Sequence, residues 1–194
     1  MQLKCGLEPQ AGLAEATTVI ERPGDDQVDS PLRSAAPHQK MEPFAGTFRS
    51  EVKMWMAANA EPMISTGLLN SSWQVDGLFL QQDYIGDPVP GATHPFQGRG
   101  FWGYNVSQGH YEGFWIDNAS TEMQMESGDV DESGTVWEMK SQMVSPQTGE
   151  VLQKRSLITL LDEDRHRVEM FFAATDGKQV KAMEINYTRT TRSA

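Results

Sequence analysis

The sequence has almost no cysteine. Cys5 is the only one among 194 residues, so the chain forms no internal disulfide and is no secreted disulfide scaffold. Apolar runs are also short, and none approaches the roughly 18 residues of a membrane-spanning helix. Near the start, Gly6, Glu8 and Gln10 interrupt any apolar core of a signal peptide. These absences predict a soluble, cytoplasmic protein without membrane insertion.

Positive charge is scarce as well. The chain has 16 lysines and arginines against 27 aspartates and glutamates, a formal net charge of −11. A surface this acidic repels phosphate groups, so we expect neither nucleic acid nor an anionic membrane as partner. The four histidines stand far apart, without the spacing of a zinc site, and the sequence predicts no metal and no cofactor. They are His38, His94, His110 and His166.

Recognisable catalytic motifs are also missing. The sequence contains no Gly-x-Ser-x-Gly nucleophile elbow and no triad order. The pair Gly98 and Gly100 resembles part of a phosphate-binding loop, but no helical pattern follows it, which excludes a dinucleotide site. Within a strand, such glycines mark a tight bend or a close approach to the backbone. We therefore expect a binding protein rather than an enzyme.

The first 35 residues show no sustained periodicity and mix proline, glycine, serine and acidic residues. Such a segment buries too little apolar surface to offset the entropy cost of ordering it. We expect residues 1–35 to be a flexible polar leader, unless the start is assigned too far upstream, and residues 36–194 to form one domain. A short helix is expected near residues 37–42, because Pro37 suits a first helical position and Pro43 would stop the helix.

From residue 47 onward, apolar residues recur with a period of two. Phe48, Val52 and Met54 alternate with charged residues, as in a strand with one buried face. The alternation returns along the chain, and short turns rich in glycine, aspartate and serine separate the runs, which predicts hairpins. We expect about ten strands, near residues 47–57, 63–73, 77–85, 97–105, 109–117, 121–130, 135–144, 151–161, 165–174 and 179–189.

The order of these strands indicates how they assemble. No long amphipathic helix lies between them, which excludes a parallel α/β sheet. Ten sequential strands would leave long free edges unless the sheet closed on itself. The sequence therefore predicts an all-β fold, an antiparallel up-and-down (meander) β-barrel with a short N-terminal helix. The proline- and glycine-rich residues 86–91 are expected to form an exposed loop at the barrel mouth.

A series of motifs spans most of this region. Gly46-Thr47-Phe48 opens the first strand, a glycine- and aromatic-rich stretch covers residues 98–105, Trp115-Ile116-Asp117 follows, and Tyr187-Thr188-Arg189 closes the series. In this order the motifs resemble a bacterial family, domain-of-unknown-function family 1579, over roughly residues 37–190. The resemblance implies a calycin-like barrel, similar in shape to lipocalins and fatty-acid-binding proteins. It implies no known reaction.

Calycin-like barrels often close one end with an aromatic residue of the first strand, held under an arginine of the last. Phe48 stands where the family usually has Trp, and Asn105 where it usually has Asp. Phe48 shares its parity with Val52, and Arg189 shares its parity with Tyr187, so both are expected to point inward. An inward arginine needs an aromatic face and carbonyl oxygens. We expect Phe48 and Arg189 to close the barrel, the alternative being that Arg189 frays into solvent.

The faces expected to point inward are rich in methionine and tryptophan. Core filling is the plainer explanation, yet a barrel of this size either just fills or leaves room for a small ligand. Methionine suits an adaptable pocket, and aromatic walls with a few polar groups describe a small-molecule site. We expect a small apolar or amphipathic ligand, with Asp117 or Arg99 as its polar anchor. The expected binding residues are Trp73, Arg99, Trp115, Asp117, Met123, Met125, Trp137, Met139 and Tyr187.

Other hypotheses remain open. One is an enzyme acting in the same cavity with Asp117 as acid or base; Asp117 equally suits the cap of the following turn. Another is a filled barrel serving a structural or interaction role, as a monomer or as a homodimer through a face bearing Phe101 and Phe171. His166 shares its parity with Val168 and is a candidate haem ligand, although a lone histidine beginning a strand is more often solvated. Strands near 109–117 and 151–161 mix both faces, so their facing stays open.

Overall fold

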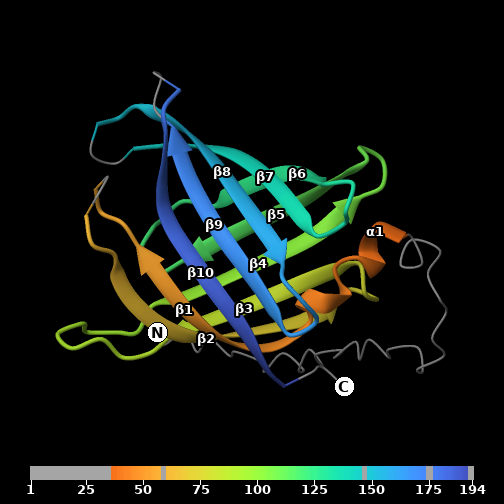
Figure 1. The fold of residues 1–194 in the computed structure, drawn as a ribbon, viewed down its shortest axis with the longest axis horizontal. Helices are drawn as coiled ribbons and strands as arrows, with labels where there is room; N and C mark the ends of the chain where they lie inside the picture. Colours follow the sequence, from red (N-terminus) through yellow and green to blue (C-terminus); the bar gives the residue numbers. More distant parts are fainter. Residues whose placement is uncertain (1–35, 58–59, 146–147, 174–176, 192–194) are drawn as a thin grey trace, which may run out of the picture.

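The computed structural model describes residues 36–57, 60–145, 148–173 and 177–191. Here ten antiparallel strands follow a meander and close into a barrel, because β1 pairs with both β2 and β10 (Figure 1). The strands are β1 (Gly46–Met54), β2 (Met63–Gln74), β3 (Phe79–Gly86), β4 (Gln97–Asn105), β5 (His110–Asp117), β6 (Gln124–Val130), β7 (Val136–Val144), β8 (Val151–Leu160), β9 (Arg165–Ala173) and β10 (Gln179–Thr191). This architecture confirms the predicted fold class and the predicted number of strands.

Strand β1 shows how the alternation of the sequence becomes a barrel wall. Phe48, Ser50 and Val52 are buried, whereas Arg49 and Glu51 are exposed. Phe48 lies opposite a β2 residue on one side and a β10 residue on the other, so this strand joins the two ends of the meander. Strand β1 thereby buries one face, and in the part of the chain that the structure describes, closure gives every strand a hydrogen-bonded neighbour on each side.

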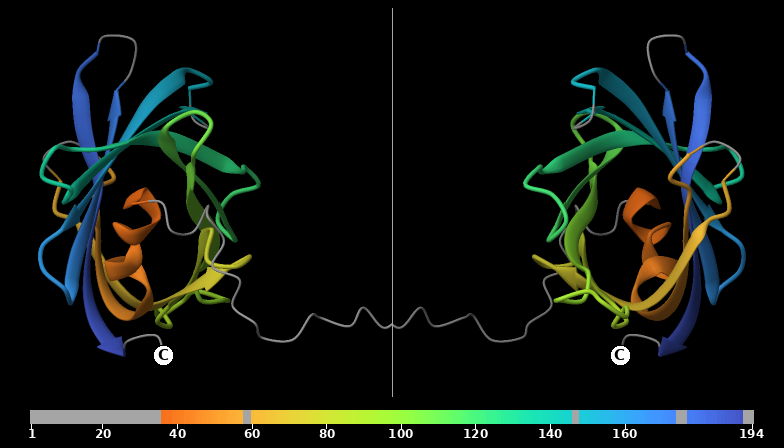
Figure 2. Two further views of the ribbon diagram at one scale, coloured as in Figure 1. Left: turned by 90° about the vertical axis from the view of Figure 1, so that its right-hand side faces the viewer. Right: turned by 90° about the vertical axis from the view of Figure 1, so that its left-hand side faces the viewer.

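A helical segment fills one end of the barrel. It consists of α1 (Ala36–Gln39) and the 3₁₀ turn η1 (Glu42–Phe44), and Figure 2 shows it inside the ring of strands. We call residues 36–45 the N-terminal plug. The expected short helix is confirmed, but the expectation that Pro43 stops it is wrong. Pro43 lies in the first turn of η1, where proline is tolerated because no backbone N–H is needed.

The plug organises the larger of two buried clusters. Phe44 packs edge-on against Trp102 and Trp137, with ring centroids 5.1 Å apart in both pairs. The cluster around the plug contains Met41, Phe44, Ala45, Leu80, Trp102, Tyr111, Trp137 and Met139. The second cluster contains Phe48, Val52, Leu69, Tyr84 and Tyr187. The strands run up and down from the plug, so loops 87–96 and 118–123 lie at the opposite end, which we call the mouth.

The expected leader, residues 1–35, lies outside the described residues, and the division of the chain into leader and domain stays a prediction. Within the described ranges, no helix has both the length and the apolar character needed to cross a membrane.

Candidate functional site

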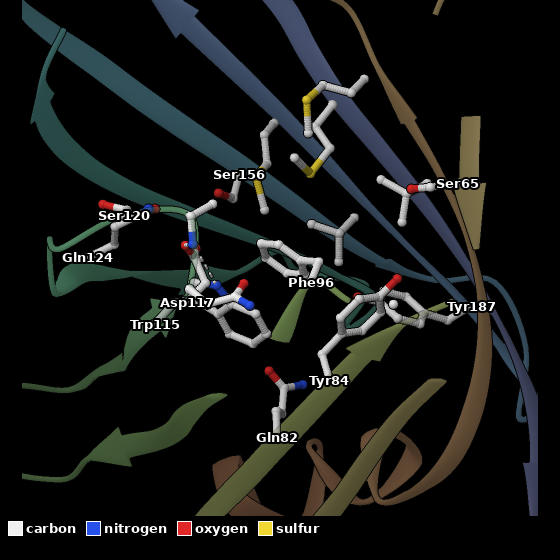
Figure 3. Close-up of a pocket in the computed structure, with 18 of the residues that line it drawn as sticks. Ser65, Gln82, Tyr84, Phe96, Trp115, Asp117, Ser120, Gln124, Ser156 and Tyr187 are labelled. Carbon is white, nitrogen blue, oxygen red and sulfur yellow. Dashed lines mark hydrogen bonds between the residues drawn. The ribbon is translucent and has the colours of Figure 1, made fainter. Parts of the chain in front are cut away.

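The mouth half of the barrel encloses a cavity of about 850 Å³. In Figure 3, Tyr84 and Tyr187 lie on one side of it, Trp115 and Asp117 lie on the other, and Phe96 lies between them. The plug cluster bounds the cavity at its floor, and loops 87–96 and 118–123 form its rim. Ligand pockets commonly measure about 300–1,000 Å³, so this space is large enough for a small organic molecule.

Tyr84 of β3 is part of the cavity wall, and a glycine on the neighbouring strand leaves room for its side chain. Its hydroxyl oxygen lies 2.9 Å from the buried Ser50 hydroxyl, and either group can donate the hydrogen bond. A Cβ at Gly67 of β2 would lie 2.2 Å from the Tyr84 hydroxyl oxygen, so the tyrosine fits only above a glycine. Burial raises the pKa of Tyr84 and also that of Tyr187. Both phenols are therefore uncharged polar groups of the cavity wall near neutral pH.

Trp115 of β5 lies flat against β4. A Cβ at Gly98 would lie 2.0 Å from a ring atom of Trp115, and a Cβ at Gly100 would lie 2.8 Å from another. The two glycines therefore form a slot for the indole, which explains why glycines recur in this strand. The expected close approach holds at both glycines: at Gly98 it is to the Trp115 ring, and at Gly100 it is to that ring and to the Phe114 carbonyl oxygen, which would lie 2.6 Å from a Cβ.

Asp117 fixes the other edge of the indole and also the turn that follows β5. Its Oδ2 accepts a hydrogen bond from Trp115 Nε1 at 3.1 Å, and its Oδ1 accepts one from the Ala119 backbone N–H at 2.9 Å. Asp117 also lines the cavity. The sequence left two alternatives for Asp117, a cap of the turn or a polar group in the cavity. In the structure this residue is both.

Polar side chains of β6 and β8 form one wall of the cavity. The Lys154 side chain is only 6% exposed, and its Nζ lies 3.3 Å from Glu126 Oε2 and 3.4 Å from Gln124 Oε1. Ser156 Oγ donates to Glu126 Oε2 at 3.2 Å. Lys154 lies opposite Ser141 of the intervening strand β7, a residue small enough for the lysine to reach over. A buried charge needs a partner, and Glu126 supplies it here.

His166 of β9 lies at the floor of the cavity and is 3% exposed. The expectation that a histidine at the start of a strand is solvated is therefore wrong. Its ring stacks on Tyr187 at 4.5 Å and meets Phe44 and Phe48 edge-on at 5.1 and 4.7 Å. Burial, and secondarily the nearby Arg189, lowers the pKa of His166 to about 3. The imidazole is thus a neutral part of an aromatic floor.

Arg189 of β10 lies at the same end as the plug. Its guanidinium carbon is 4.5 Å from the centre of the Phe48 ring. Its two terminal nitrogens donate to the backbone carbonyls of Ala45 and Pro43, both at 2.6 Å. Asp164 accepts a further hydrogen bond from Arg189 Nε at 3.1 Å. These contacts tie the last strand to the plug and to the first strand.

The structure divides the expected binding residues into three groups. Trp115, Asp117 and Tyr187 line the cavity. Trp137 and Met139 are buried in the plug cluster, and Trp73 packs against that cluster. These three lie at the closed end rather than in the cavity wall, and Trp73 Nε1 donates to Glu42 of the plug at 2.9 Å.

The remaining three expectations, Arg99, Met123 and Met125, are wrong because these side chains face outward. Arg99 forms an ion pair with Asp83, and its side chain is 59% exposed. On β4 the slot glycines and Trp102 take the inward positions, which leaves the outer face to Arg99.

Met123 and Met125 are 65% and 60% exposed. Strand β6 turns its even-numbered residues inward, because Glu126 pairs with Lys154 inside the barrel. Gly128 also passes so close to β7 that a Cβ there would lie 1.9 Å from the Glu138 carbonyl oxygen. The buried ion pair therefore overrides the apolar character of the two methionines in setting the facing of β6.

Several wall residues escaped prediction from the sequence. They are Gln82, Tyr84, Phe96, Gln124, Glu126, Lys154 and Ser156. A signal exists for β8, where Leu152, Ile158 and Leu160 share the parity of Lys154. The odd-numbered Val151 and Leu157 obscure that signal, so the alternation does not identify the inward face.

The charged side chains that line the cavity are few. Within the described ranges, no group of three or more histidine, cysteine, aspartate or glutamate side chains is placed to hold a metal ion. The polar groups of the cavity are spread over two walls, with the acidic Asp117 on β5 and the Lys154–Glu126 pair on β6 and β8. The site therefore combines an apolar interior with a few fixed polar groups.

Residues 33–189 match the family described as "Protein of unknown function (DUF1579)". The chain belongs to this family. No curated protein matches the sequence. Among solved structures, the DUF1579 chain is similar to Rv2717c from M. tuberculosis, with 14% identity, 80% of this chain and 98% of that chain covered, and a TM-score of 0.56. It is also similar to the S-type phycobiliprotein lyase CPES from Guillardia theta, with 10% identity, 84% and 97% coverage, and a TM-score of 0.52. At such identities the similarity establishes the fold alone.

Proposed function

We propose that this DUF1579 protein binds a small amphipathic molecule inside its barrel. The observation that carries the proposal is the cavity of about 850 Å³, which has apolar walls and one charged pair on its β6–β8 side. Small-molecule sites typically combine apolar walls with a few placed polar groups. The methionines of β9 and β10, Met170 and Met183, add adaptable surface to the apolar wall.

Two measurements test this proposal. Native mass spectrometry of the purified protein is expected to show a retained small molecule, or uptake of one when candidates are added. Nile red, a neutral apolar dye, is expected to gain fluorescence with a saturable, one-to-one dependence on protein. A protein that carries no ligand and takes up no probe contradicts the proposal.

A matched pair of variants localises the binding. Val168→Trp adds an indole to the cavity wall, and we expect it to weaken Nile red binding about tenfold or more because the added ring occupies ligand volume. Val144→Trp adds the same ring at an exposed β7 position, where Val144 is 56% exposed, and is expected to bind as the wild type does. Equal affinity in both variants would place the dye outside the barrel.

The enzyme hypothesis has less support than binding. Both carboxylate oxygens of Asp117 already accept hydrogen bonds from within the rim, one of them from a backbone N–H. A filled, purely structural barrel is disfavoured by the size of the cavity. A calycin-like barrel remains part of the proposal, supported by the open mouth and by the contact of Arg189 with Phe48 at the closed end. Cytoplasmic location and the choice between monomer and homodimer stay predictions.

The haem-ligand hypothesis for His166 also stays a prediction, and it has a direct test. Rings of Tyr187, Phe44 and Phe48 surround the imidazole, which leaves little of it open to an iron atom. Adding hemin and recording the Soret band would decide between the two outcomes. A histidine-ligated spectrum that disappears in His166→Phe supports haem binding, and its absence in the wild type removes the hypothesis.

A further inference from the structure

The cavity carries a negative charge that no cation of the described residues compensates. Four acidic or basic side chains other than histidine line it: Asp87, Asp117, Glu126 and Lys154. Asp87 pairs with Arg49, and Glu126 pairs with Lys154. Asp117 has no such partner within the described ranges, since its two hydrogen bonds come from the neutral Trp115 indole and the Ala119 amide.

Beside this carboxylate lies a fixed aromatic surface. The glycine slot on β4 holds the Trp115 ring from one side, and the hydrogen bond from Nε1 to Asp117 fixes its orientation. The ring also lines the cavity, so its remaining surface is available to a ligand. The face of an indole attracts cations, and it does so best among aromatic side chains. Asp117 and Trp115 thus present a carboxylate and a π-face next to each other.

We propose that the ligand is an organic cation, a protonated amine carried on an apolar body, with its ammonium group held between the Asp117 carboxylate and the Trp115 ring. This inference rests on the proposed binding function. The apolar body would extend across the cavity toward Tyr84, Phe96 and Met170, which also line it. The bound ammonium compensates the charge of Asp117, as Lys154 compensates that of Glu126.

The charges around the cavity disfavour the opposite choice, an anionic ligand. Lys154 is the only basic side chain other than histidine that lines the cavity among the described residues, and it is almost fully buried against Glu126. An anion would therefore approach Glu126 and Asp117 together with the lysine. The chain as a whole has a formal net charge of −11, which concentrates cations rather than anions near its surface.

A series of ligands with one body and three head groups tests the charge preference. Decylamine, decanol and decanoate are titrated against the Nile red complex of the full chain at neutral pH. We expect decylamine to displace the dye at about tenfold lower concentration than decanol, because a charge-assisted hydrogen bond and a cation–π contact are added. Decanoate is expected to be the weakest of the three.

Three variants assign the preference to its residues. Asp117→Asn has nearly the same size but only one acceptor oxygen, so it loses the charge and one of the two hydrogen bonds of Asp117. We expect it to lose the tenfold advantage of decylamine over decanol, a ratio measured in one protein that is insensitive to a general weakening of the rim. Glu122→Gln removes an exposed carboxylate from the same rim loop, so it controls for general charge and is expected to behave as the wild type does. Lys154→Met removes the cavity's lysine and leaves the Glu126 carboxylate without its partner, so it is expected to strengthen decylamine binding and to weaken that of decanoate.

The outcomes separate this inference from the function on which it rests. If Nile red and decanol bind but decylamine has no advantage, or if Asp117→Asn leaves that advantage intact, the cation proposal is overturned and the binding function stands. Tighter binding of decanoate that is lost in Lys154→Met also overturns it, in favour of an anion site at the lysine. If neither the dye nor any of the three ligands binds, the proposed function fails as well.

Discussion

At the scale of single residues, the barrel is unusual in the polar side chains that it buries. Ser50, Lys154, Ser156 and His166 are all 6% exposed or less. A buried polar group costs free energy unless a partner compensates it. Ser50 has the Tyr84 hydroxyl, and Lys154 has Glu126. His166 avoids the larger cost by remaining uncharged among aromatic rings, and this gives it a measurable effect on stability.

The pKa of His166 predicts a loss of stability in mild acid. The folded state holds its pKa at about 3, whereas an unfolded histidine titrates near pH 6.5. Between these values the unfolded chain binds a proton that the folded chain does not, so the free energy of unfolding falls as pH falls below about 6.5. The expected loss from this residue is about 2 kcal/mol between about pH 7.5 and pH 5. Urea unfolding at a series of pH values measures it.

A matched pair of variants isolates the histidine. His166→Phe keeps an aromatic ring against Tyr187 but cannot be protonated, so its stability should fall less steeply over the same pH range. His38 is also buried with a lowered pKa and should leave a residual slope. His94→Phe replaces an exposed histidine and should keep the wild-type slope. An unchanged slope in His166→Phe contradicts the assignment.

Loss of the Arg189 side chain is predicted to destabilise the closed end of the barrel. Arg189→Met removes the two 2.6 Å hydrogen bonds to the plug carbonyls and the charge over the Phe48 ring. We expect the free energy of unfolding to fall by about 2–3 kcal/mol, since buried carbonyls lose charged donors. Arg99→Met, at an exposed surface ion pair, should cost less than about 1 kcal/mol. Thermal unfolding of both variants gives the comparison, and equal losses would remove the closing role of Arg189.

At the scale of the strand, the sequence predicts facing well where one kind of interaction dominates. The alternation along β1 predicts that Phe48 and Val52 point inward, and both are buried, with the small Ser50 buried between them. Met123, just before β6, and Met125 within it alternate with polar residues and predict the wrong face, because Glu126 points inward to meet Lys154. That partner lies on β8, 28 residues further along the chain, so no local pattern in β6 contains the information. Facing is least predictable where a strand contributes to the polar wall.

The glycine slot on β4 holds the Trp115 ring of β5, so a change in the slot should affect both strands. Gly98→Ala places a methyl group 2.0 Å from the Trp115 ring, so the indole must leave its position. We expect a loss of about 1–3 kcal/mol in the free energy of unfolding and a changed near-ultraviolet circular dichroism spectrum. Because Trp115 positions the proposed cation site, decylamine should also lose its advantage over decanol.

Gly86→Ala is the control for the slot. Its added Cβ would lie 3.4 Å from the nearest atom, which is ordinary van der Waals contact. This variant should keep the wild-type spectrum and change stability by less than about 1 kcal/mol. A Gly98→Ala protein with an unchanged spectrum and unchanged ligand preference would show that β4 tolerates the displacement elsewhere.

At the scale of the whole molecule, the architecture follows from the sequence more completely than the cavity does. The period of two, the turn residues and the lack of long helices suffice to predict a closed meander of ten strands. The cavity depends on how far the plug reaches into the barrel, which the packing of Met41 and Phe44 decides. It also depends on which side chains are too small to fill the mouth half, such as Ser65 and Ser156. Both features depend on side chains from strands that lie far apart in the sequence. The residue pattern of any single strand therefore cannot predict them.

Closure of the barrel predicts that its two buried clusters unfold together. Phe44 is 1% exposed in the plug cluster and Leu69 is 2% exposed in the second cluster, and β3 contributes to both clusters through Leu80 and Tyr84. Phe44→Ala and Leu69→Ala should each lower the free energy of unfolding by about 3–4 kcal/mol. In both variants the urea transition should stay single, because opening any strand removes partners from two neighbours.

Two probes at opposite ends measure this coupling. Tryptophan fluorescence reports mainly on the plug cluster, which contains Trp102 and Trp137, while release of bound Nile red reports on the mouth half. The two transitions should coincide with that of far-ultraviolet circular dichroism, and Phe79→Ala, at a 42% exposed site, should shift all three only slightly. If Phe44→Ala separates the fluorescence transition from the others, the plug is an independent unit. The cavity floor could then open while the strands remain paired, and a ligand would have a second way out of the barrel.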